Sequence, residues 1–243
     1  MNEWALKLKD VRKTYRTGPI EVPALRGVTL SIGAGEFAAT AGPSGSGKTT
    51  LLNIIGGLDR ADTGDIWVAG QNLQVLSSGE LAHLRLQRIG FVFQTYNLLP
   101  VLTALENAEF TLLLQGMPAR ERREKVEKLF SQIGLAGLED RRPKELSGGQ
   151  QQRVAVARAM VTEPALILAD EPTANLDSAS AIALLDVMEQ LNRTTGTTFL
   201  FSTHDPQVME RAHRLIHLRD GQIVGDETRD RQEAVVTAKK DAV

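Results

Sequence analysis

Residues 42–49 read Gly-Pro-Ser-Gly-Ser-Gly-Lys-Thr and carry the strongest structural signal in this 243-residue chain. They fit the pattern G-x-x-x-x-G-K-[ST], in which glycines let the backbone wrap closely around phosphate groups. The stretch follows strand-like residues 37–41 and precedes an apolar run at 50–55, so its N–H groups should lie at a helix start, where anions bind. The predicted phosphate-binding residues are Gly42, Ser44, Gly45, Ser46, Gly47, Lys48, Thr49 and Thr50.

A second motif, at residues 166–171, supports a nucleotide site. An apolar run ends there in two adjacent carboxylates, Asp170 and Glu171. Neighbouring side chains of an extended segment point in opposite directions, so one acid is free to help hold Mg²⁺ while the other addresses an attacking water. We expect Asp170 and the Thr49 hydroxyl to hold the metal, and Lys48 to bridge the β- and γ-phosphates. A solvated strand end is the structural alternative for the two acids.

Composition excludes several classes of protein. The chain has 28 Lys and Arg against 30 Asp and Glu, a net charge of −2, which argues against a nucleic-acid-binding protein with a broad basic face. It has no cysteine, so disulfides, cysteine-ligated zinc, iron–sulfur clusters and thiol nucleophiles are excluded. No apolar stretch approaches the ~20 residues of a membrane-spanning helix. We therefore expect a soluble chain.

Alternation of strand-like and helix-like runs indicates an α/β fold with a parallel sheet. Glycine- and proline-rich turns separate the first three strands, which predicts an antiparallel layer at one edge. Residues 96–163 are mostly helical in pattern, over Ala104–Gln115, Ala119–Ile133 and Gly148–Thr162, and suggest an inserted lobe. The predicted divisions are a core at 1–95 and 164–225, a helical subdomain at 96–163 and a polar tail at 226–243. The expected strands are Leu6–Val11, Val28–Ile32, Phe37–Ala41, Asp65–Val68, Ile89–Phe93, Ala165–Ala169 and Thr197–Ser202.

Residues 146–150, Leu-Ser-Gly-Gly-Gln, open a helix whose glycines expose N–H groups to an anion. Alone, this is equally a capped helix with a flexible start. Together with the two motifs above, it resembles the signature of ATP-binding-cassette (ABC) ATPases, and the resemblance covers residues 4–224. It implies a P-loop NTPase with a RecA-like core, an antiparallel β edge layer and an inserted α-helical subdomain, with ATP and Mg²⁺ as cofactors.

The resemblance also implies roles for single residues. Tyr15 is similar to the aromatic residue that stacks on adenine, although a strand aromatic is also ordinary core material. Gln94 resembles the loop glutamine that reaches Mg²⁺ and the attacking water, and this assignment depends on the family alone. His204, at a strand end, resembles the histidine that contacts the γ-phosphate. Glu171 would be the base. The residues implied to act across a subunit boundary are Ser147, Gly148, Gly149, Gln150 and Asp177.

In this family two copies meet head to tail, and each ATP lies between the phosphate loop of one copy and residues 147–149 of the other. Residues 56–59, 89–107 and 171–177 resemble the ATPases of lipoprotein-releasing systems, macrolide-type exporters and a cell-division complex. This implies an ATPase subunit at the cytoplasmic face of the inner membrane. It would drive a permease that docks near Tyr96–Leu102, with a periplasmic adaptor reached through the permease.

Two other functions compete. One is a nucleotide-dependent regulator of a membrane partner, as in cell division, rather than a true transporter. The other is an ABC ATPase of ribosomes or nucleic acids, which would carry tandem cassettes, coiled coils or zinc modules that are missing from this sequence. The presence of Lys48, Gln94, Glu171 and His204 favours an active ATPase, and no nucleic-acid partner is expected.

Overall fold

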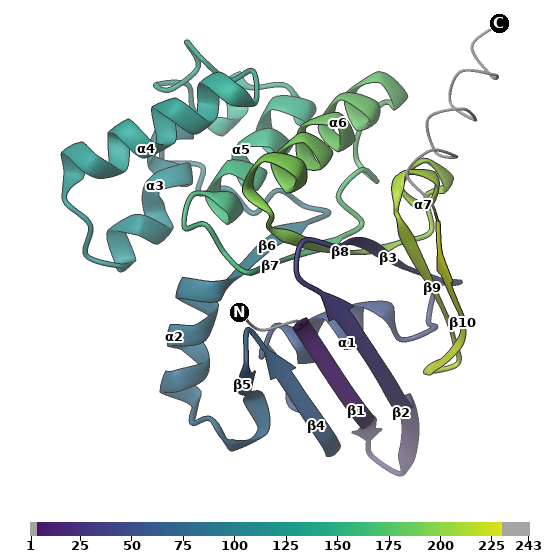
Figure 1. Ribbon diagram of the computed structural model, residues 1–243. Helices are drawn as coiled ribbons and strands as arrows, with labels where there is room; N and C mark the ends of the chain where they lie inside the picture. The colour runs from purple at the N-terminus through teal and green to yellow at the C-terminus, as the bar shows by residue number, and fades with distance from the viewer. Residues whose placement is uncertain (1–3, 230–243) are drawn as a thin grey trace, which may run out of the picture.

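Two β-sheets and a set of helices make up the computed structural model, which describes residues 4–229 (Figure 1). The first sheet is antiparallel, in the order β2-β1-β4-β5, and the second has the order β10-β9-β3-β8-β7-β6. All neighbours in the second sheet are parallel except β10, which is antiparallel to β9. The strands are β1 (Trp4–Thr17), β2 (Ile20–Gly33), β3 (Phe37–Ala41), β4 (Thr63–Val68), β5 (Gln71–Asn72), β6 (Ile89–Phe93), β7 (Leu166–Asp170), β8 (Thr198–Thr203), β9 (Arg214–Arg219) and β10 (Gln222–Thr228).

The helix α1 (Lys48–Ile55) lies between the two sheets. Its residues Leu51, Leu52, Ile54 and Ile55 are buried in one cluster with residues from strands of both sheets. This packing holds the helix start at the end of β3, where the phosphate loop leaves the second sheet. The other helices are α2 (Ser78–Arg88), α3 (Ala104–Leu114), α4 (Ala119–Gln132), α5 (Gly148–Met160), α6 (Ser178–Thr195) and α7 (Pro206–Arg211), with short 3₁₀ turns at Leu73–Val75 and Pro143–Glu145.

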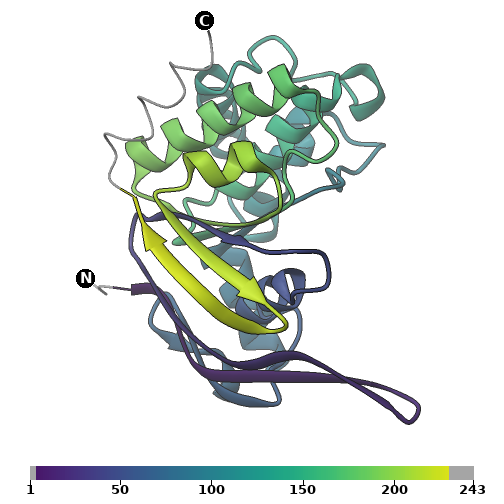
Figure 2. The same cartoon turned by 90° about the vertical axis from the view of Figure 1, so that its right-hand side faces the viewer.

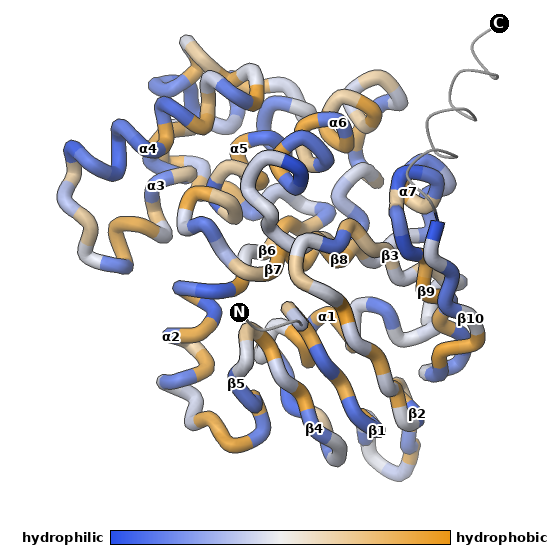
Figure 3. The backbone as a smooth tube through the Cα atoms, viewed as in Figure 1, coloured by the Kyte–Doolittle hydropathy of each residue, from blue (hydrophilic) through white to orange (hydrophobic). Residues whose placement is uncertain are grey.

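The predicted antiparallel layer is present, but the assignment of Phe37–Ala41 to it was wrong. This strand, β3, pairs in parallel with β8 and β9 at the centre of the second sheet. All five of its residues are buried, so both faces of the strand must pack against other parts of the chain, as they do for a central strand of a parallel sheet. Figure 3 shows the hydrophobic segments that run along this part of the sheet.

The helices α3, α4 and α5 follow β6 in the chain and precede β7, within the stretch where the sequence predicts a helical lobe. They share a core that includes Leu112, Val126, Phe130 and Val154, all fully buried. In Figure 1 they lie together with α6 on one side of the second sheet, and the antiparallel sheet lies on the other.

The C-terminal hairpin β9–β10 continues past residue 225, so the predicted tail does not begin at 226. Asp226 is paired in β10 with Ile216, and its two carboxylate oxygens accept hydrogen bonds of 2.8 and 2.7 Å from the Arg214 guanidinium. This two-point contact helps β10 stay paired with β9 as far as Thr228, where β10 ends. The rest of the predicted tail, residues 230–243, lies outside the described residues. Figure 2 shows the hairpin beside the long strands of the first sheet.

Candidate functional site

The phosphate loop joins β3 to α1, and its shape depends on glycine. Gly47 is the N-cap of α1 with φ 103°, and Gly42 packs so tightly that a Cβ there would lie 2.1 Å from the Leu218 carbonyl oxygen. The loop is also tied to the β9–β10 turn, because Gly221 N–H donates to the Ser46 carbonyl over 3.0 Å. No side chain caps α1, so its first N–H groups remain available to an anion.

Lys48 is the first residue of α1 and is buried, with 7% of its surface exposed. Its ammonium donates to the carbonyl oxygens of Gly42, over 2.7 Å, and Pro43, over 3.1 Å. An ammonium has three N–H donors, so these contacts hold the charge inside the loop and leave a donor for a bound anion.

The donors predicted for Mg²⁺ meet where β7 ends. The Thr49 hydroxyl lies 3.5 Å from the Asp170 carboxylate. A hydroxyl and one carboxylate, both oxygen donors, fit Mg²⁺, which takes few protein ligands and completes its octahedron with phosphates and water. Within residues 4–229, no cluster of three or more acidic, histidine or cysteine side chains forms a fuller metal cage.

Glu171 lies just after β7 and has an unusual backbone, with φ 46°. This left-handed conformation is rare for a residue with a side chain and is a hallmark of functional sites. It turns the carboxylate away from Asp170 and towards β8: one oxygen lies 2.6 Å from Nδ1 of His204, and the other accepts from Thr203 Oγ over 3.3 Å. The two acids thus diverge as predicted, but the left-handed turn, rather than strand alternation alone, separates them.

Tyr15 lies on β1, in the antiparallel sheet. Its hydroxyl donates to the Asp59 carboxylate over 2.7 Å, and the Lys13 ammonium lies 5.1 Å from its ring centre and 2.8 Å from Asp59. Partial burial, followed by the Asp59 contact, raises the pKa of Tyr15. Although burial opposes it, hydrogen bonds from Lys13 and Tyr15 lower the pKa of Asp59. The ring is 39% exposed, so it is not a core aromatic.

A cavity of about 690 Å³ unites these groups. Its walls come from β1, β2, the phosphate loop and the ends of β6, β7 and β8, and Gly42, Ser46 and Asp170 lie outside its lining. Sequence reasoning missed the β2 wall, because residues 22–24 carry no motif and reach the site only through the packing of the first sheet. The lining residues are Tyr15, Val22, Pro23, Ala24, Pro43, Ser44, Gly45, Gly47, Lys48, Thr49, Thr50, Gln94, Glu171 and His204.

The second anion-binding motif lies outside this cavity. Ser147 caps α5 in a capping box: its hydroxyl accepts from Gln150 N–H over 3.3 Å, and its own N–H donates to the Gln150 side chain over 2.8 Å. Asp177 caps the neighbouring helix α6, and hydrogen bonds from the Ser180 side chain and N–H lower the pKa of Asp177. The predicted residues Ser147, Gly148, Gly149, Gln150 and Asp177 therefore lie outside the lining of this cavity, at the starts of α5 and α6.

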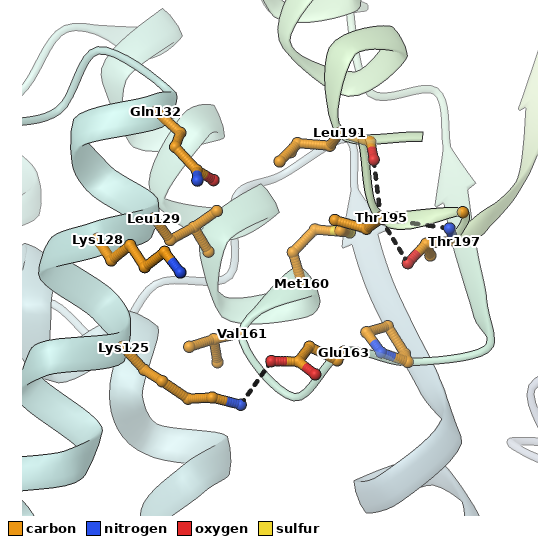
Figure 4. A pocket seen from close by; sticks show the side chains of 12 residues that line it. Lys125, Lys128, Leu129, Gln132, Met160, Val161, Glu163, Leu191, Thr195 and Thr197 are labelled. Carbon is orange, nitrogen blue, oxygen red and sulfur yellow. Dashed lines mark hydrogen bonds and ion pairs between the residues drawn. The ribbon is translucent and has the colours of Figure 1, made fainter. Parts of the chain in front are cut away.

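Two further hollows lie away from the predicted phosphate site. One, of about 540 Å³, separates α4 from the turn after α6, and Lys125 pairs with Glu163 across it (Figure 4). The other, of about 650 Å³, is an apolar groove between α2, β6, α3 and α5. Its lining includes Leu58, Phe91 and Leu114, together with two guanidinium groups, Arg85 and Arg158, and no acidic residue. Within residues 4–229, no helix combines the length and the hydropathy needed to cross a bilayer.

Comparison with known proteins adds independent findings. Residues 25–174 match the model of the ABC transporter family. The chain is 49% identical over 222 residues to the lipoprotein-releasing system ATP-binding protein LolD of Anaeromyxobacter dehalogenans, covering 91% of this chain and 93% of that one. It is 47% identical to the macrolide export ATP-binding/permease protein MacB of Syntrophobacter fumaroxidans, with 90% of this chain matching about a third (31%) of that longer protein.

A solved structure shows the same architecture. The ATP-binding cassette MJ0796, in a dimeric post-hydrolysis state bound to ADP and phosphate, is 42% identical to this chain and superimposes with a TM-score of 0.84. The match covers 92% of this chain and 98% of that one. The predicted fold class is thereby confirmed.

Proposed function

Because the chain belongs to the ABC transporter family and is an ATP-binding subunit with ATPase activity, we propose that it forms half of a dimeric motor for a separate membrane permease. The observation that carries this proposal is the separation of its anion-binding groups. The phosphate loop lines the cavity, whereas Ser147 and its neighbours at the start of α5 lie outside the cavity lining. Two copies arranged head to tail would bring each loop against the partner's α5 start and enclose two ATP molecules.

Hydrolysis would use the groups around the cavity. Lys48 and the N–H groups of the loop bind the β- and γ-phosphates, and the partner's Ser147 adds a hydroxyl donor. Glu171 orients and deprotonates the attacking water, with His204 beside its carboxylate and Gln94 at the rim. Mg²⁺ held by Thr49, Asp170 and Gln94 would neutralise charge on the phosphates.

Replacing Glu171 tests this function. Glu171→Gln should bind ATP but hydrolyse it about 10²–10⁴-fold more slowly, because a positioned base is worth that much. It should also accumulate as an ATP-bound dimer in size-exclusion chromatography with light scattering. Lys48→Ala, which loses the loop ammonium, should neither bind ATP nor dimerise. Full ATPase activity of Glu171→Gln, or an ATP-loaded species that stays monomeric, would contradict the proposal.

The permease would dock in the apolar groove beside the predicted segment Tyr96–Leu102. Asn97 of this segment lines the groove, and Leu99 and Val101 are exposed next to it in the chain. The groove is apolar, and its two arginines donate to backbone carbonyls but have no acidic residue in the lining to balance their charge, so it suits a short amphipathic helix that carries a carboxylate. In this proposal the chain works at the cytoplasmic face of the inner membrane, and a periplasmic adaptor would be reached through the permease.

A charge placed in the groove should uncouple the two proteins. Leu114→Asp should abolish co-purification with the membrane permease, while the ATPase rate of the isolated chain stays within about twofold, since the groove is separate from the cavity. The matched control is Val75→Asp, at an exposed apolar residue outside the groove. Unchanged co-purification of Leu114→Asp would refute this docking site.

A further inference from the structure

Gln152 is a fully buried polar residue that lies on α5, five positions after Ser147. Its side-chain amide nitrogen donates to two backbone carbonyls, that of Phe93 over 3.1 Å and that of Pro172 over 2.8 Å. Carbonyl oxygens only accept, so the NH₂ group must face them. The amide oxygen, Oε1, has no hydrogen-bond partner.

The two carbonyls adjoin residues of the hydrolytic machinery. Phe93 ends β6 and directly precedes Gln94, whose own carbonyl accepts from the Asn175 side chain over 3.0 Å. Pro172 directly follows Glu171, whose left-handed backbone persists only if the surrounding structure fixes it. One buried NH₂ group thus joins α5 to both segments.

We propose that Gln152 is a positioning residue that couples the start of α5 to Gln94 and Glu171. When the partner's nucleotide binds at Ser147, any displacement of α5 reaches both hydrolytic segments through this amide. Movement of Ser147 reaches Gln152 directly, because the two residues lie less than two turns apart on the same helix. The inference rests on the roles proposed above for Gln94 and Glu171.

The unpartnered oxygen makes the proposal sharply testable, since only the donors of Gln152 are used. Gln152→Met keeps the length and apolar packing of the side chain but removes both donors. Gln152→Lys keeps donors and removes the oxygen that has no partner. If Gln152 serves only to fill space, Met should be tolerated and a buried lysine should do harm. If Gln152 positions the two segments, methionine should do harm and lysine should be tolerated.

The experiment measures ATP binding and steady-state hydrolysis by the purified full chain. We expect Gln152→Met to lower kcat about 10- to 100-fold, the usual effect of misplacing catalytic groups slightly, with ATP affinity within about twofold of wild type. Gln152→Lys should recover most of that loss. Gln151→Met, the same change one residue earlier, is the matched control, because the Gln151 side chain bonds only the carbonyl of Leu146 at its own helix start.

Amide hydrogen exchange of each variant distinguishes a local loss of positioning from misfolding of the whole chain. Faster exchange confined to residues 93–97 and 171–176 in Gln152→Met supports positioning, whereas exchange raised throughout α5 and the core overturns it. A wild-type kcat in Gln152→Met also overturns it. Glu171→Gln, measured in parallel, separates the two failures: if that variant stays active, the assignment of the base is at fault.

Discussion

At the scale of single residues, an unfavourable backbone conformation separates two functional groups of this site. Glu171 adopts φ 46° although it is not glycine, and it directly follows the β7 residue that lies near Thr49. The strain separates two carboxylates that are adjacent in sequence, so that one lies beside the threonine hydroxyl and the other beside His204. A glutamine side chain has nearly the same shape as glutamate, so Glu171→Gln should remove the base and leave the backbone turn unchanged.

A prediction at this scale concerns how Tyr15 is held, and it rests on the proposal that this cavity-lining ring stacks on adenine. The Asp59 carboxylate accepts the Tyr15 hydroxyl, so Asp59→Ala should free the ring and weaken ATP binding about threefold, the worth of one net hydrogen bond. Affinity for inorganic triphosphate, which has no base to stack, should not change. Calorimetric titration with both ligands would measure this.

Tyr15→Ala supplies the control for that prediction. It should weaken ATP binding by about 1–3 kcal/mol, as loss of a stacked base does. In a chain that already carries Tyr15→Ala, the Asp59→Ala change should have no additional effect. An equal additional loss in that background would mean that Asp59 acts on ATP by another route.

At the scale of elements, helix starts could be predicted from the sequence and strand partners could not. Ser77, Thr103 and Ser147 each cap a helix in a capping box, a local pattern in which the two partners lie three residues apart. The partners of β3 lie far along the chain, and its small residues carry no alternation to mark a face. The strand β9 carries no motif at all, and its place beside β3 follows from packing alone.

The hairpin β9–β10 yields a pH-dependent prediction. Hydrogen bonds from Arg214 lower the pKa of Asp226 below its unfolded value, so the stabilisation is complete above that unfolded value, near 4, and is lost as the pH falls through the folded pKa. Asp226→Asn should therefore lower the unfolding temperature at pH 7 by about 1–4 °C and by less at pH 3.5, where part of the stabilisation is lost. Thermal unfolding monitored by circular dichroism at both pH values checks this.

The matched control for the hairpin is Asp220→Asn, at the turn and so at the opposite end from Arg214. Asparagine tolerates the left-handed backbone there, so little change is expected at either pH. If Asp226→Asn lowered the unfolding temperature equally at both pH values, the ion pair would not be its source.

For the whole molecule, the proposed head-to-tail dimer means that each chain would hold two unlike halves of a site, the cavity and the α5 start. Most residues of both halves could be predicted, because the phosphate loop, residues 166–171 and residues 146–150 are short contiguous motifs. The wall at residues 22–24, the support by Asp59 and the link through Gln152 could not, because each joins segments that only the folded chain brings together.

Mixing two inactive variants tests this arrangement. Lys48→Ala lacks a working phosphate loop, and Ser147→Arg blocks the α5 start, so neither variant alone should hydrolyse ATP. A mixed dimer has one intact site, because the loop of the Ser147→Arg chain meets the α5 start of the Lys48→Ala chain, so an equal mixture should recover up to about a quarter of the wild-type rate when half of the dimers are mixed. No recovery, with mixed dimers shown by native mass spectrometry, would mean that each site is completed within one chain.

The bond between Gly221 and Ser46, together with the close packing of Gly42 on Leu218, has a consequence for biosynthesis. The phosphate loop is translated early, yet the turn that braces it is among the last parts of the described chain to leave the ribosome. A nascent chain that ends before this turn has the complete motif but not the complete loop. Nucleotide should therefore recognise and stabilise only a nascent chain that has extended past residue 221.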